Sequence, residues 1–301
     1  MIKEILSAEL YELISQQFNL NKIEEVRLRA DLPVVISVDG KNFILAGKDK
    51  EYYIATDNDI NYCLSKVTQN SMYAVSDQIK QMYISYYGGI RIGITGQVVK
   101  NSNGIKTLKY ISSINIRIPH EVKGFANIAL NFIVSGKEIN STLIVSSPGA
   151  GKTTLLRDIC RGLSTQNYIK NILLVDERNE LACAVNGRPM LNVGLFTDVV
   201  SGGDKLSAFS YGIRTLKPNV IITDELGTKE DYEAVKKAIA SGVAVIASVH
   251  AKDQYDLLKN EYAKDLLNSR LISRIIVLSD KTPNRYVGIY DGNLKCIYMP
   301  Y

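Results

Sequence analysis

Hydrophobic and polar positions follow one rhythm over the first 120 residues of this chain and another over the rest. Apolar residues recur at helical spacing over residues 2–17, which predicts a helix with one buried face. Residues 23–45 alternate apolar and polar side chains, a pattern typical of strands. Asp39 and Gly40 interrupt this alternation and predict a hairpin turn between two short strands.

Helical and β-type patterns continue to mix up to residue 120. The turn signal KNSNG separates two β-rich segments, and Pro119 begins a short link. We therefore predict a small α+β domain over residues 1–120. Its further predicted elements are a helix from Thr56 or Asp57 to Val67, a helix over 71–80, and the β-rich segments 82–100 and 105–118.

From about residue 121 onward, helical segments alternate with short, continuously apolar strands. A helix over 124–135 precedes the first strand, and a terminal hairpin is predicted around Asp291-Gly292. This alternation predicts an α/β fold with a mostly parallel sheet that is covered on both faces. Later strands are predicted at Ile172–Val175, Val220–Thr223, Val243–Val249 and Ile272–Leu278.

The stretch that organises the second region is an apolar strand over 142–145, followed by SSPGAGKTT and an amphipathic helix. A strand, a glycine-containing loop and a helix in this order are typical of the phosphate-binding P-loop. Glycines let the backbone wrap closely around phosphate oxygens, and the helix N-terminus attracts anions. The pattern has a glycine five positions before Gly151, where this chain has Ser146. A turn without a ligand is the alternative, and the intact GKT core argues against it.

The P-loop side chains have separate predicted tasks. Lys152 is expected to reach the β- and γ-phosphates, and the Thr153 hydroxyl is expected to bind Mg²⁺. ATP and Mg²⁺ are therefore the predicted ligands. The residues expected to bind the nucleotide are Ser147, Pro148, Gly149, Ala150, Gly151, Lys152, Thr153 and Thr154.

Two apolar strands end in pairs of acidic residues. The strand that leads to Asp224 and Glu225 has the Walker B pattern, so we assign Asp224 to Mg²⁺ and Glu225 to the attacking water. Asp176 and Glu177 end another strand. Since ligands of open α/β sheets bind at the carboxyl ends of the strands, this pair is a candidate for the same reaction. Either pair could instead be solvated loop acids.

One histidine and several arginines are further candidates. His250 ends an apolar strand and could form a hydrogen bond with the γ-phosphate, although a lone histidine there is more often structural. Arg91 and Arg117 lie on the β-rich segments of the first region, and Arg214 precedes the Walker B strand. Guanidinium groups can stabilise the charge of a transferring phosphate, but each arginine could equally be an ordinary surface residue.

Composition narrows the choice of function. The 301 residues carry a net charge of +5, spread over both regions, so no basic block indicates a nucleic-acid or lipid-binding surface. The four cysteines are far apart, which favours reduced thiols in a cytoplasmic protein over a zinc site or disulfides. No apolar run is long enough to span a bilayer, and the first residues do not resemble a signal peptide. We therefore expect a protein that is peripheral to a membrane through a protein partner.

The ordered motifs resemble those of the type II and type IV secretion ATPases. SSPGAGKTT, LLVDERNEL, YGIRTLKPNVIITDELG and SGVAVIASVHA are similar, in this order, to their Walker A motif, Asp box, Walker B motif and His box. Within that superfamily, EEVRLRADLPV, GGIRIGITG, ISSINIRI and TDELGTKEDYEA resemble the sporulation members along nearly the whole chain. Many secretion ATPases have Gly-Glu where this chain has Asp224-Glu225, so the division of Mg²⁺ binding between Asp224 and the Asp box stays open.

The resemblance implies a RecA-like ATPase domain over residues 121–301 and a homo-oligomer in the form of a hexameric ring. It also implies an ATP-driven motor on the mother-cell side of the channel between mother cell and forespore. Membrane-embedded sporulation channel proteins would be its partners, and the nucleotide would lie between the two domains. By the same resemblance, Asp176, Glu177 and Glu180 form the Asp box, Glu225 is the Walker B glutamate, His250 is the His-box histidine, and Arg91 and Arg117 are the N-domain arginines that reach the nucleotide.

Two classes of function remain open from the sequence. The first is an ATP-hydrolysing motor of a secretion-like complex, which the two acid pairs favour. The second is a nucleotide-dependent assembly or structural subunit with little turnover. A RecA-like nucleic-acid motor is a third alternative, and the evenly spread charge argues against it. We therefore expect neither nucleic-acid binding nor direct lipid binding.

Overall fold

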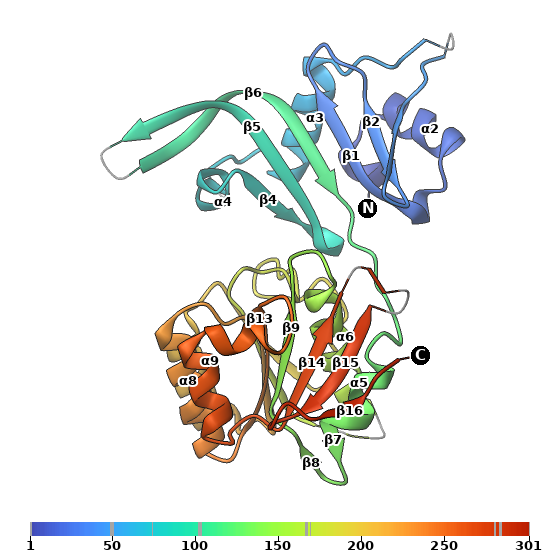
Figure 1. The fold of residues 1–301 in the computed structure, drawn as a ribbon. Coiled ribbons are helices and arrows are strands. Elements are labelled where there is room, and N and C mark those ends of the chain that lie inside the picture. The colour runs from blue at the N-terminus through green and yellow to red at the C-terminus, as the bar shows by residue number, and fades with distance from the viewer. Residues whose placement is uncertain are drawn as a thin grey trace. The chain divides into compact units, whose positions relative to one another are not determined.

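The computed structural model describes residues 2–48, 51–73, 75–101, 104–165, 168, 170–279, 281–282 and 285–300. The chain forms two compact units, Met1–His120 and Glu121–Tyr301 (Figure 1). Each unit has its own large sheet, and the buried apolar residues of each pack around that sheet.

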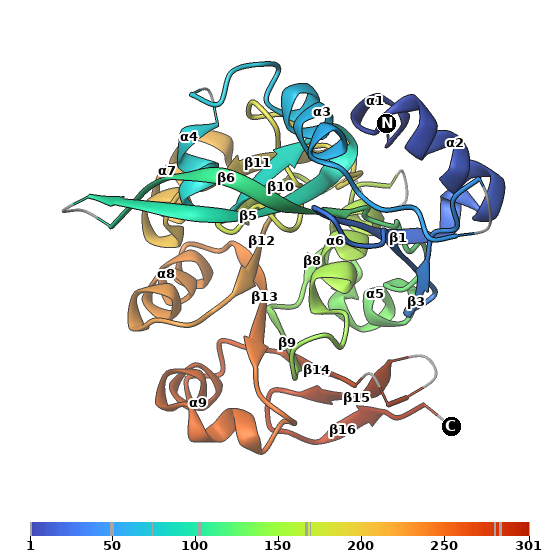
Figure 2. The ribbon, with the colours of Figure 1, turned by 90° about the horizontal axis from the view of Figure 1, so that it is seen from above.

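The first unit is built on a six-stranded antiparallel sheet with the strand order β3-β2-β1-β6-β5-β4 in its described residues. Its strands are β1 (Ile23–Arg29), β2 (Val35–Val38), β3 (Lys41–Ile44), β4 (Tyr83–Tyr86), β5 (Ile90–Asn101) and β6 (Gly104–Arg117). Its helices are α1 (Ile2–Ile5), α2 (Ala8–Gln17), α3 (Asp57–Val67) and α4 (Ser76–Lys80), with the 3₁₀ helices η1 (Leu20–Lys22) and η2 (Tyr87–Gly89). Figure 2 shows α1 to α4 on one side of this sheet. The core therefore lies on that face, where alternate strand residues such as Val26, Ile92 and Ile116 are fully buried.

Two local features of the first unit, a hairpin turn and a capped helix start, are found where the sequence predicts them. Asp39 and Gly40 have positive φ values of 48° and 72° and connect β2 to β3, as a tight hairpin turn requires. Thr56 caps α3, and Asp59 completes a capping box with it. The predicted hairpin and the predicted start of this helix are confirmed.

Two helix predictions in the first unit were too long. The helix predicted over 2–17 is divided into α1 and α2, because Ser7 accepts a hydrogen bond from the first turn of α2 and donates one to Asp59 (2.9 Å). Of the helix predicted over 71–80, only the second half is helical, as α4. Residues 102–103, the centre of the predicted KNSNG turn, lie outside the described residues.

The described part of the second unit contains an eight-stranded sheet with the order β11-β10-β12-β13-β9-β14-β15-β16. The first six strands in this order, from β11 through β10, β12, β13 and β9 to β14, pair in parallel. Strands β15 and β16 follow antiparallel at one edge. The strands are β9 (Thr142–Ser146), β10 (Ile172–Asp176), β11 (Thr197–Ser201), β12 (Val220–Glu225), β13 (Ala244–His250), β14 (Arg274–Leu278), β15 (Tyr286–Asp291) and β16 (Cys296–Tyr298). A separate small hairpin is formed by β7 (Val134–Ser135) and β8 (Glu138–Ile139).

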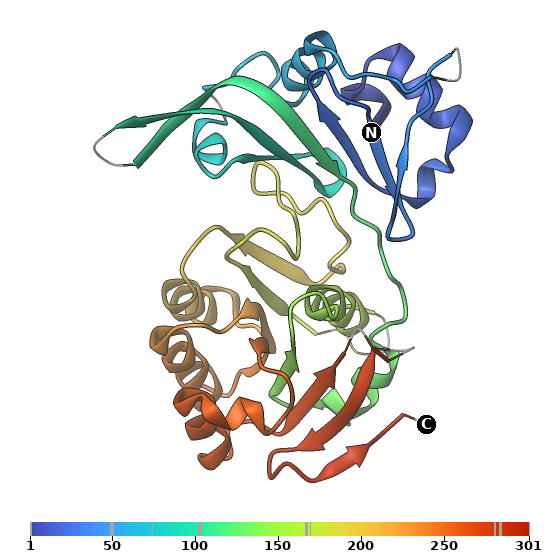
Figure 3. The same cartoon turned by 45° about the horizontal axis from the view of Figure 1, so that its top comes forward.

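Helices cover both faces of the eight-stranded sheet (Figure 3). They are α5 (Asn127–Ile133) and α6 (Lys152–Leu163) on one face, and α7 (Lys205–Leu216), α8 (Lys229–Ala240) and α9 (Glu261–Asn268), with η3 (Asp256–Lys259), on the other. In β9, Leu143 and Val145 enter the core beneath α7 to α9, whereas Ile144 enters the core beneath α5 and α6. Burial on both faces explains why the strands read as continuous apolar runs.

The predicted α/β architecture of the second unit is confirmed. Each of the four strands expected after the P-loop is present with its ends shifted by two residues or fewer, and β15 and β16 form the terminal hairpin. The helix predicted over 124–135 was too long, because residues after Ile133 enter the hairpin of β7 and β8. Strand β11 was not predicted, since its sequence TDVVS is short and half polar.

Candidate functional site

The loop between β9 and α6 passes through left-handed backbone conformations at two glycines. Gly149 has a φ of 82° and Gly151 a φ of 100°, which residues with a Cβ rarely adopt. A Cβ at Gly151 would also lie 3.2 Å from Nη1 of Arg285. The backbone therefore favours glycine at both positions, and Gly151 is the glycine of the GKT core of the P-loop pattern.

The N-terminus of α6 offers backbone donors next to this loop. Gly151 is its N-cap residue, and in the described residues no side chain caps this end of the helix. The first N–H groups of a helix have no partner within the helix, and the helix dipole adds a partial positive charge there. The loop and the helix end therefore form a concave surface suited to an anion.

Lys152, the first residue of α6, directs its ammonium back to the loop. Its Nζ donates to the carbonyl oxygens of Ser146 (3.0 Å) and Ser147 (3.2 Å) and lies 3.0 Å from Nδ1 of His250. Since an ammonium can only donate, Nδ1 accepts, and the proton of the neutral ring is on Nε2. Burial lowers the pKa of Lys152, and the charge of Glu225 partly opposes this effect.

Glu225, at the end of β12, has two nitrogen groups close to one carboxylate oxygen. Its Oε2 lies 3.0 Å from Nε2 of His250 and 2.9 Å from Nη1 of Arg178. Arg178 follows β10 and His250 ends β13, and these strands flank β12 in the sheet. Together with Lys152, the three side chains form a continuous line of contacts along the carboxyl edge of the parallel strands, where such folds bind ligands.

Asp224 is a buried acid that has an ion-pair neighbour, Lys205, but no hydrogen-bond partner among the described residues. The residue is only 8% exposed, and in the described residues neither carboxylate oxygen has a hydrogen-bond partner. Burial raises the pKa of Asp224 to about 6, while the nearby charge of Lys205 lowers it in part and that of Asp176 raises it. Buried carboxylates are normally satisfied, so this one is a candidate to bind a cation.

Lys205, at the start of α7, is a buried cation surrounded by acids. Its Nζ contacts the carboxylate of Glu177 and lies 3.5 Å from Asp224 and 3.9 Å from Asp231. Burial acts to lower the pKa of Lys205, but the hydrogen bond with Glu177 and the surrounding negative charges outweigh it, so the pKa is raised. Glu177 is therefore engaged in an ion pair, and its predicted part in the reaction stays a prediction.

Asp176 stabilises the loop that follows β10. The residue is fully buried, and its carboxylate accepts hydrogen bonds from the backbone N–H groups of Glu180 (2.8 Å), Leu181 (3.0 Å) and Ala182 (2.8 Å). These three contacts hold the loop after β10 in one conformation. The predicted catalytic role of Asp176 has no contact that supports it and stays a prediction.

A pocket of about 320 Å³ opens beside the P-loop and brings most of the predicted residues together. Ser147 and Ala150 belong to the loop but do not line the pocket. Arg178, Ser248 and Arg285 line it without having been predicted. The pocket is lined by Pro148, Gly149, Gly151, Lys152, Thr153, Thr154, Arg178, Glu180, Asp224, Glu225, Ser248, His250 and Arg285.

The two arginines predicted from the first region belong to the first unit. Arg91 on β5 and Arg117 on β6 are directly opposite each other in the antiparallel pair. The guanidinium of Arg91 lies 4.0 Å from the ring centroid of Tyr83, and Nε of Arg117 lies 3.8 Å from the carboxylate of Glu25. Both side chains therefore have partners within their own sheet, and their contact with a nucleotide stays a prediction.

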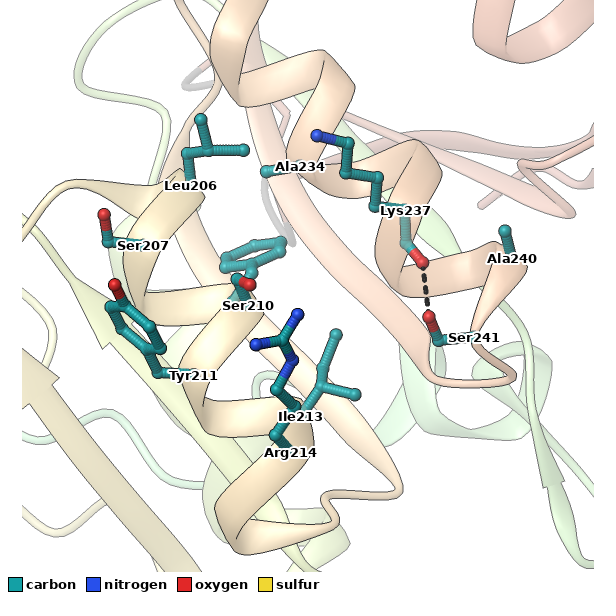
Figure 4. A pocket seen from close by; sticks show the side chains of 11 residues that line it. Leu206, Ser207, Ser210, Tyr211, Ile213, Arg214, Ala234, Lys237, Ala240 and Ser241 are labelled. Carbon is teal, nitrogen blue, oxygen red and sulfur yellow. Dashed lines mark hydrogen bonds between the residues drawn. The ribbon is translucent and has the colours of Figure 1, made fainter.

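A second concavity, of about 610 Å³, lies between α7 and α8 (Figure 4). Arg214 lines this groove and does not line the P-loop pocket. The buried Phe209 contributes to the groove, and Ser241 donates a hydrogen bond to the carbonyl of Lys237 at its edge. Arg214 is thus separated from the residues that meet at the P-loop.

Comparison with known sequences places the chain in a family. The family model described as sporulation stage III, protein AA, matches residues 1–297. The stage III sporulation protein AA of Bacillus subtilis (strain 168) is 36% identical over 302 residues, which cover 98% of this chain and 95% of that protein. The uncharacterised protein ycf45 of Cyanidium caldarium is 31% identical over 155 residues, 50% of this chain and 44% of that protein.

Solved structures show the same fold at low sequence identity. The pilus retraction motor PilT, solved with bound ADP, has a TM-score of 0.64 and 15% identity and covers 97% of this chain and 82% of its own. The ATPase DotB of Legionella pneumophila has a TM-score of 0.58 and 14% identity and covers 94% and 79%. The predicted fold, a RecA-like ATPase domain preceded by a smaller α+β part, is confirmed by these likenesses. The chain belongs to the sporulation stage III protein AA family, and its fold is that of the secretion ATPases.

Proposed function

We propose that this protein is a Mg²⁺-dependent ATPase that serves as the motor of a secretion-like channel complex between mother cell and forespore. The observation that carries the proposal is the meeting of Lys152, Asp224 and Glu225 in one pocket beside the P-loop. Phosphate binding, metal binding and water activation each need one of these side chains. Membership of the sporulation family supplies the cellular setting of the proposal.

The phosphates of ATP would bind to the loop and to the start of α6. The N–H groups of this helix end and the ammonium of Lys152 supply positive charge to the β- and γ-phosphates. Arg285, whose Nη1 lies 3.3 Å from the carbonyl of Gly149, adds a guanidinium at the outer side of the same loop.

The side chains beside the P-loop fit a Mg²⁺ ion. Asp224 has two buried oxygens without hydrogen-bond partners in the described chain, and Thr153 lines the same pocket. No group of three or more His, Cys, Asp or Glu side chains among the described residues could hold a metal ion. This agrees with Mg²⁺, which in nucleotide sites takes few protein ligands besides phosphate oxygens and waters. When bound, the ion would neutralise charge on the phosphates.

Glu225 would orient the water that attacks the γ-phosphate. A carboxylate can accept a proton from water, and His250 and Arg178 hold one of its oxygens in place. His250 also contacts Lys152, so it connects the water-activating acid to the phosphate-binding lysine. Glu180 lines the same pocket and is a second acid beside the proposed phosphate site.

The proposal includes a hexameric ring that is docked on membrane-embedded sporulation channel proteins. Its support is the family and the fold of the chain. Of the helices that the structure describes, none is both long and apolar enough to cross a bilayer. Recruitment by a membrane protein, on the cytoplasmic side, is therefore part of the proposal. A nucleotide contact from Arg91 or Arg117 is also part of the proposal, and it would require the guanidinium to leave its partner in its own sheet.

Steady-state ATP hydrolysis by the full chain, measured with Mg²⁺ and with EDTA, tests the proposal together with the mass of the ATP-bound particle. Mg²⁺-dependent turnover by a ring-sized particle is the expected result. A ring that binds ATP without turnover would favour the alternative, an assembly subunit. Strong stimulation by single-stranded DNA, or binding to protein-free liposomes, would contradict the expectation of a protein partner.

A further inference from the structure

We infer that Arg178 is a positioning residue for ATP hydrolysis, because it fixes the orientation of the Glu225 carboxylate; the inference rests on the proposed function. None of the recognised motifs assigns a task to this arginine. It lies between the two acids Glu177 and Glu180, in the loop that follows β10. Its Nη1 lies 2.9 Å from Oε2 of Glu225.

The close contacts of Glu225 show how the orientation of its carboxylate is fixed. Arg178 and His250 approach the same oxygen, Oε2, from two different elements. The terminal torsion of a glutamate is broad when the carboxylate is free, so two close contacts to one oxygen restrict it. In the part of the chain that the structure describes, the ion-pair contacts of this carboxylate are made through Oε2 and leave Oε1 without one. It is therefore the oxygen left to accept a hydrogen bond from a water.

The loop that carries Arg178 is held by other residues. Asp176 accepts hydrogen bonds from three backbone N–H groups of this loop. Arg157 on α6 donates to the carbonyl oxygens of Glu180 (2.8 Å) and Leu181 (2.7 Å). The loop thus keeps its conformation without the side chain of Arg178, and a rigid support is what a positioning group needs.

The contact between Arg178 and Glu225 contributes little to the stability of the fold. The side chain of Arg178 is 60% exposed and that of Glu225 is 24% exposed. Water screens such pairs, and they contribute little to stability. Removal of the guanidinium should therefore leave the fold intact and act on the carboxylate alone.

The test compares Arg178→Ala, Arg178→Lys and the control Arg188→Ala in the full chain. Arg188 is an exposed arginine of the same connection between β10 and β11, and it does not line the pocket. We expect Arg178→Ala to lower kcat about tenfold with KM within about twofold, the pattern of a group that acts in the transition state only. Arg178→Lys, which keeps one donor, should recover most of the rate, and Arg188→Ala should match the parent.

A double-mutant cycle with Glu225→Gln separates positioning from other roles. If Arg178 acts through Glu225, Arg178→Ala has no further effect on the residual rate of Glu225→Gln. An unchanged kcat in Arg178→Ala, a raised KM with unchanged kcat, or full additivity in the cycle would each overturn the inference while the parent remains an ATPase. Absence of ATP turnover in the parent would overturn the proposed function, and the inference with it.

Discussion

Replacing Asp224 by asparagine should make the protein more stable at neutral pH and abolish ATP hydrolysis. The carboxylate is buried, and neither oxygen has a hydrogen-bond donor in the described residues. Such a group is destabilising when it is ionised, and it persists where a function requires it. Asparagine has nearly the same shape and no charge, so it removes the electrostatic cost together with the proposed metal ligand.

The size of the expected gain in stability follows from the pKa of Asp224. Burial raises this pKa from 3.8 to about 6, with an opposing effect of Lys205 and a reinforcing effect of Asp176. Each pKa unit corresponds to about 1.36 kcal/mol, so the ionised carboxylate costs the folded state about 3 kcal/mol at neutral pH. Lys205 keeps Glu177 and Asp231 as partners in the variant, so no cation is left unpaired.

The size of this stability difference depends on pH. Below pH 3.8 the carboxyl group is protonated in the folded and the unfolded chain, and it carries no penalty. Between pH 3.8 and about 6 the folded protein keeps a proton that the unfolded chain has lost, so the parent loses stability as pH rises. Above about pH 6 the loss is complete. The stability of Asp224→Asn relative to the parent should therefore grow by up to about 3 kcal/mol between pH 4 and pH 7.5.

Urea unfolding followed by far-UV circular dichroism measures this difference, since the chain has no tryptophan to report on unfolding. Asp198→Asn, at an exposed position of β11, is the matched control and should stay within about 0.5 kcal/mol of the parent at every pH. A difference between Asp224→Asn and the parent that does not change with pH would refute the reasoning. So would a variant that is less stable than the parent at pH 7.5.

The remaining predictions concern the nucleotide. Lys152→Ala should lower kcat/KM for ATP at least about a hundredfold and leave the circular dichroism spectrum unchanged. The reason is that burial of the ammonium disfavours its charge, which is retained to bind the phosphates. Parent-like turnover would rule out the P-loop assignment. Glu225→Gln should still bind a fluorescent ATP analogue but hydrolyse ATP at least about a hundredfold more slowly, the scale of losing a positioned base; a small effect would move the role to Glu180. Arg285→Ala should raise KM about fivefold with little change in kcat, since its guanidinium lies at the rim of the loop; an unchanged KM would exclude a phosphate contact.

The parallel sheet and the P-loop could be predicted from the sequence because local physical constraints determine both. Strands such as β9 and β10 are buried along their whole length, so their apolar runs are unbroken. Gly149 and Gly151 have backbone angles that other residues rarely adopt, so glycine marks the loop in the sequence. In both cases the signal lies within a few neighbouring residues.

The features that were missed depend on contacts between distant parts of the chain. Ser7 ends the first helix early through a hydrogen bond with Asp59, 52 residues later. Arg285 reaches the P-loop across 136 residues, and no periodic pattern indicates such a contact. Strand β11 is held by its pairing with β10, since its own sequence is half polar. Tertiary pairing overrides weak local preference in each case.

The two Asp-Glu pairs show most directly what the structure adds. Both pairs follow an apolar strand, and the sequence left open which aspartate serves Mg²⁺. Asp176 accepts three backbone hydrogen bonds and so has its oxygens committed to the loop, whereas those of Asp224 have no donor in the described residues. The glutamates differ in the same way, because Glu177 pairs with the buried Lys205 and Glu225 keeps one oxygen for a water. One pair therefore builds the support that carries Arg178, and the other pair is left for the chemistry that we propose.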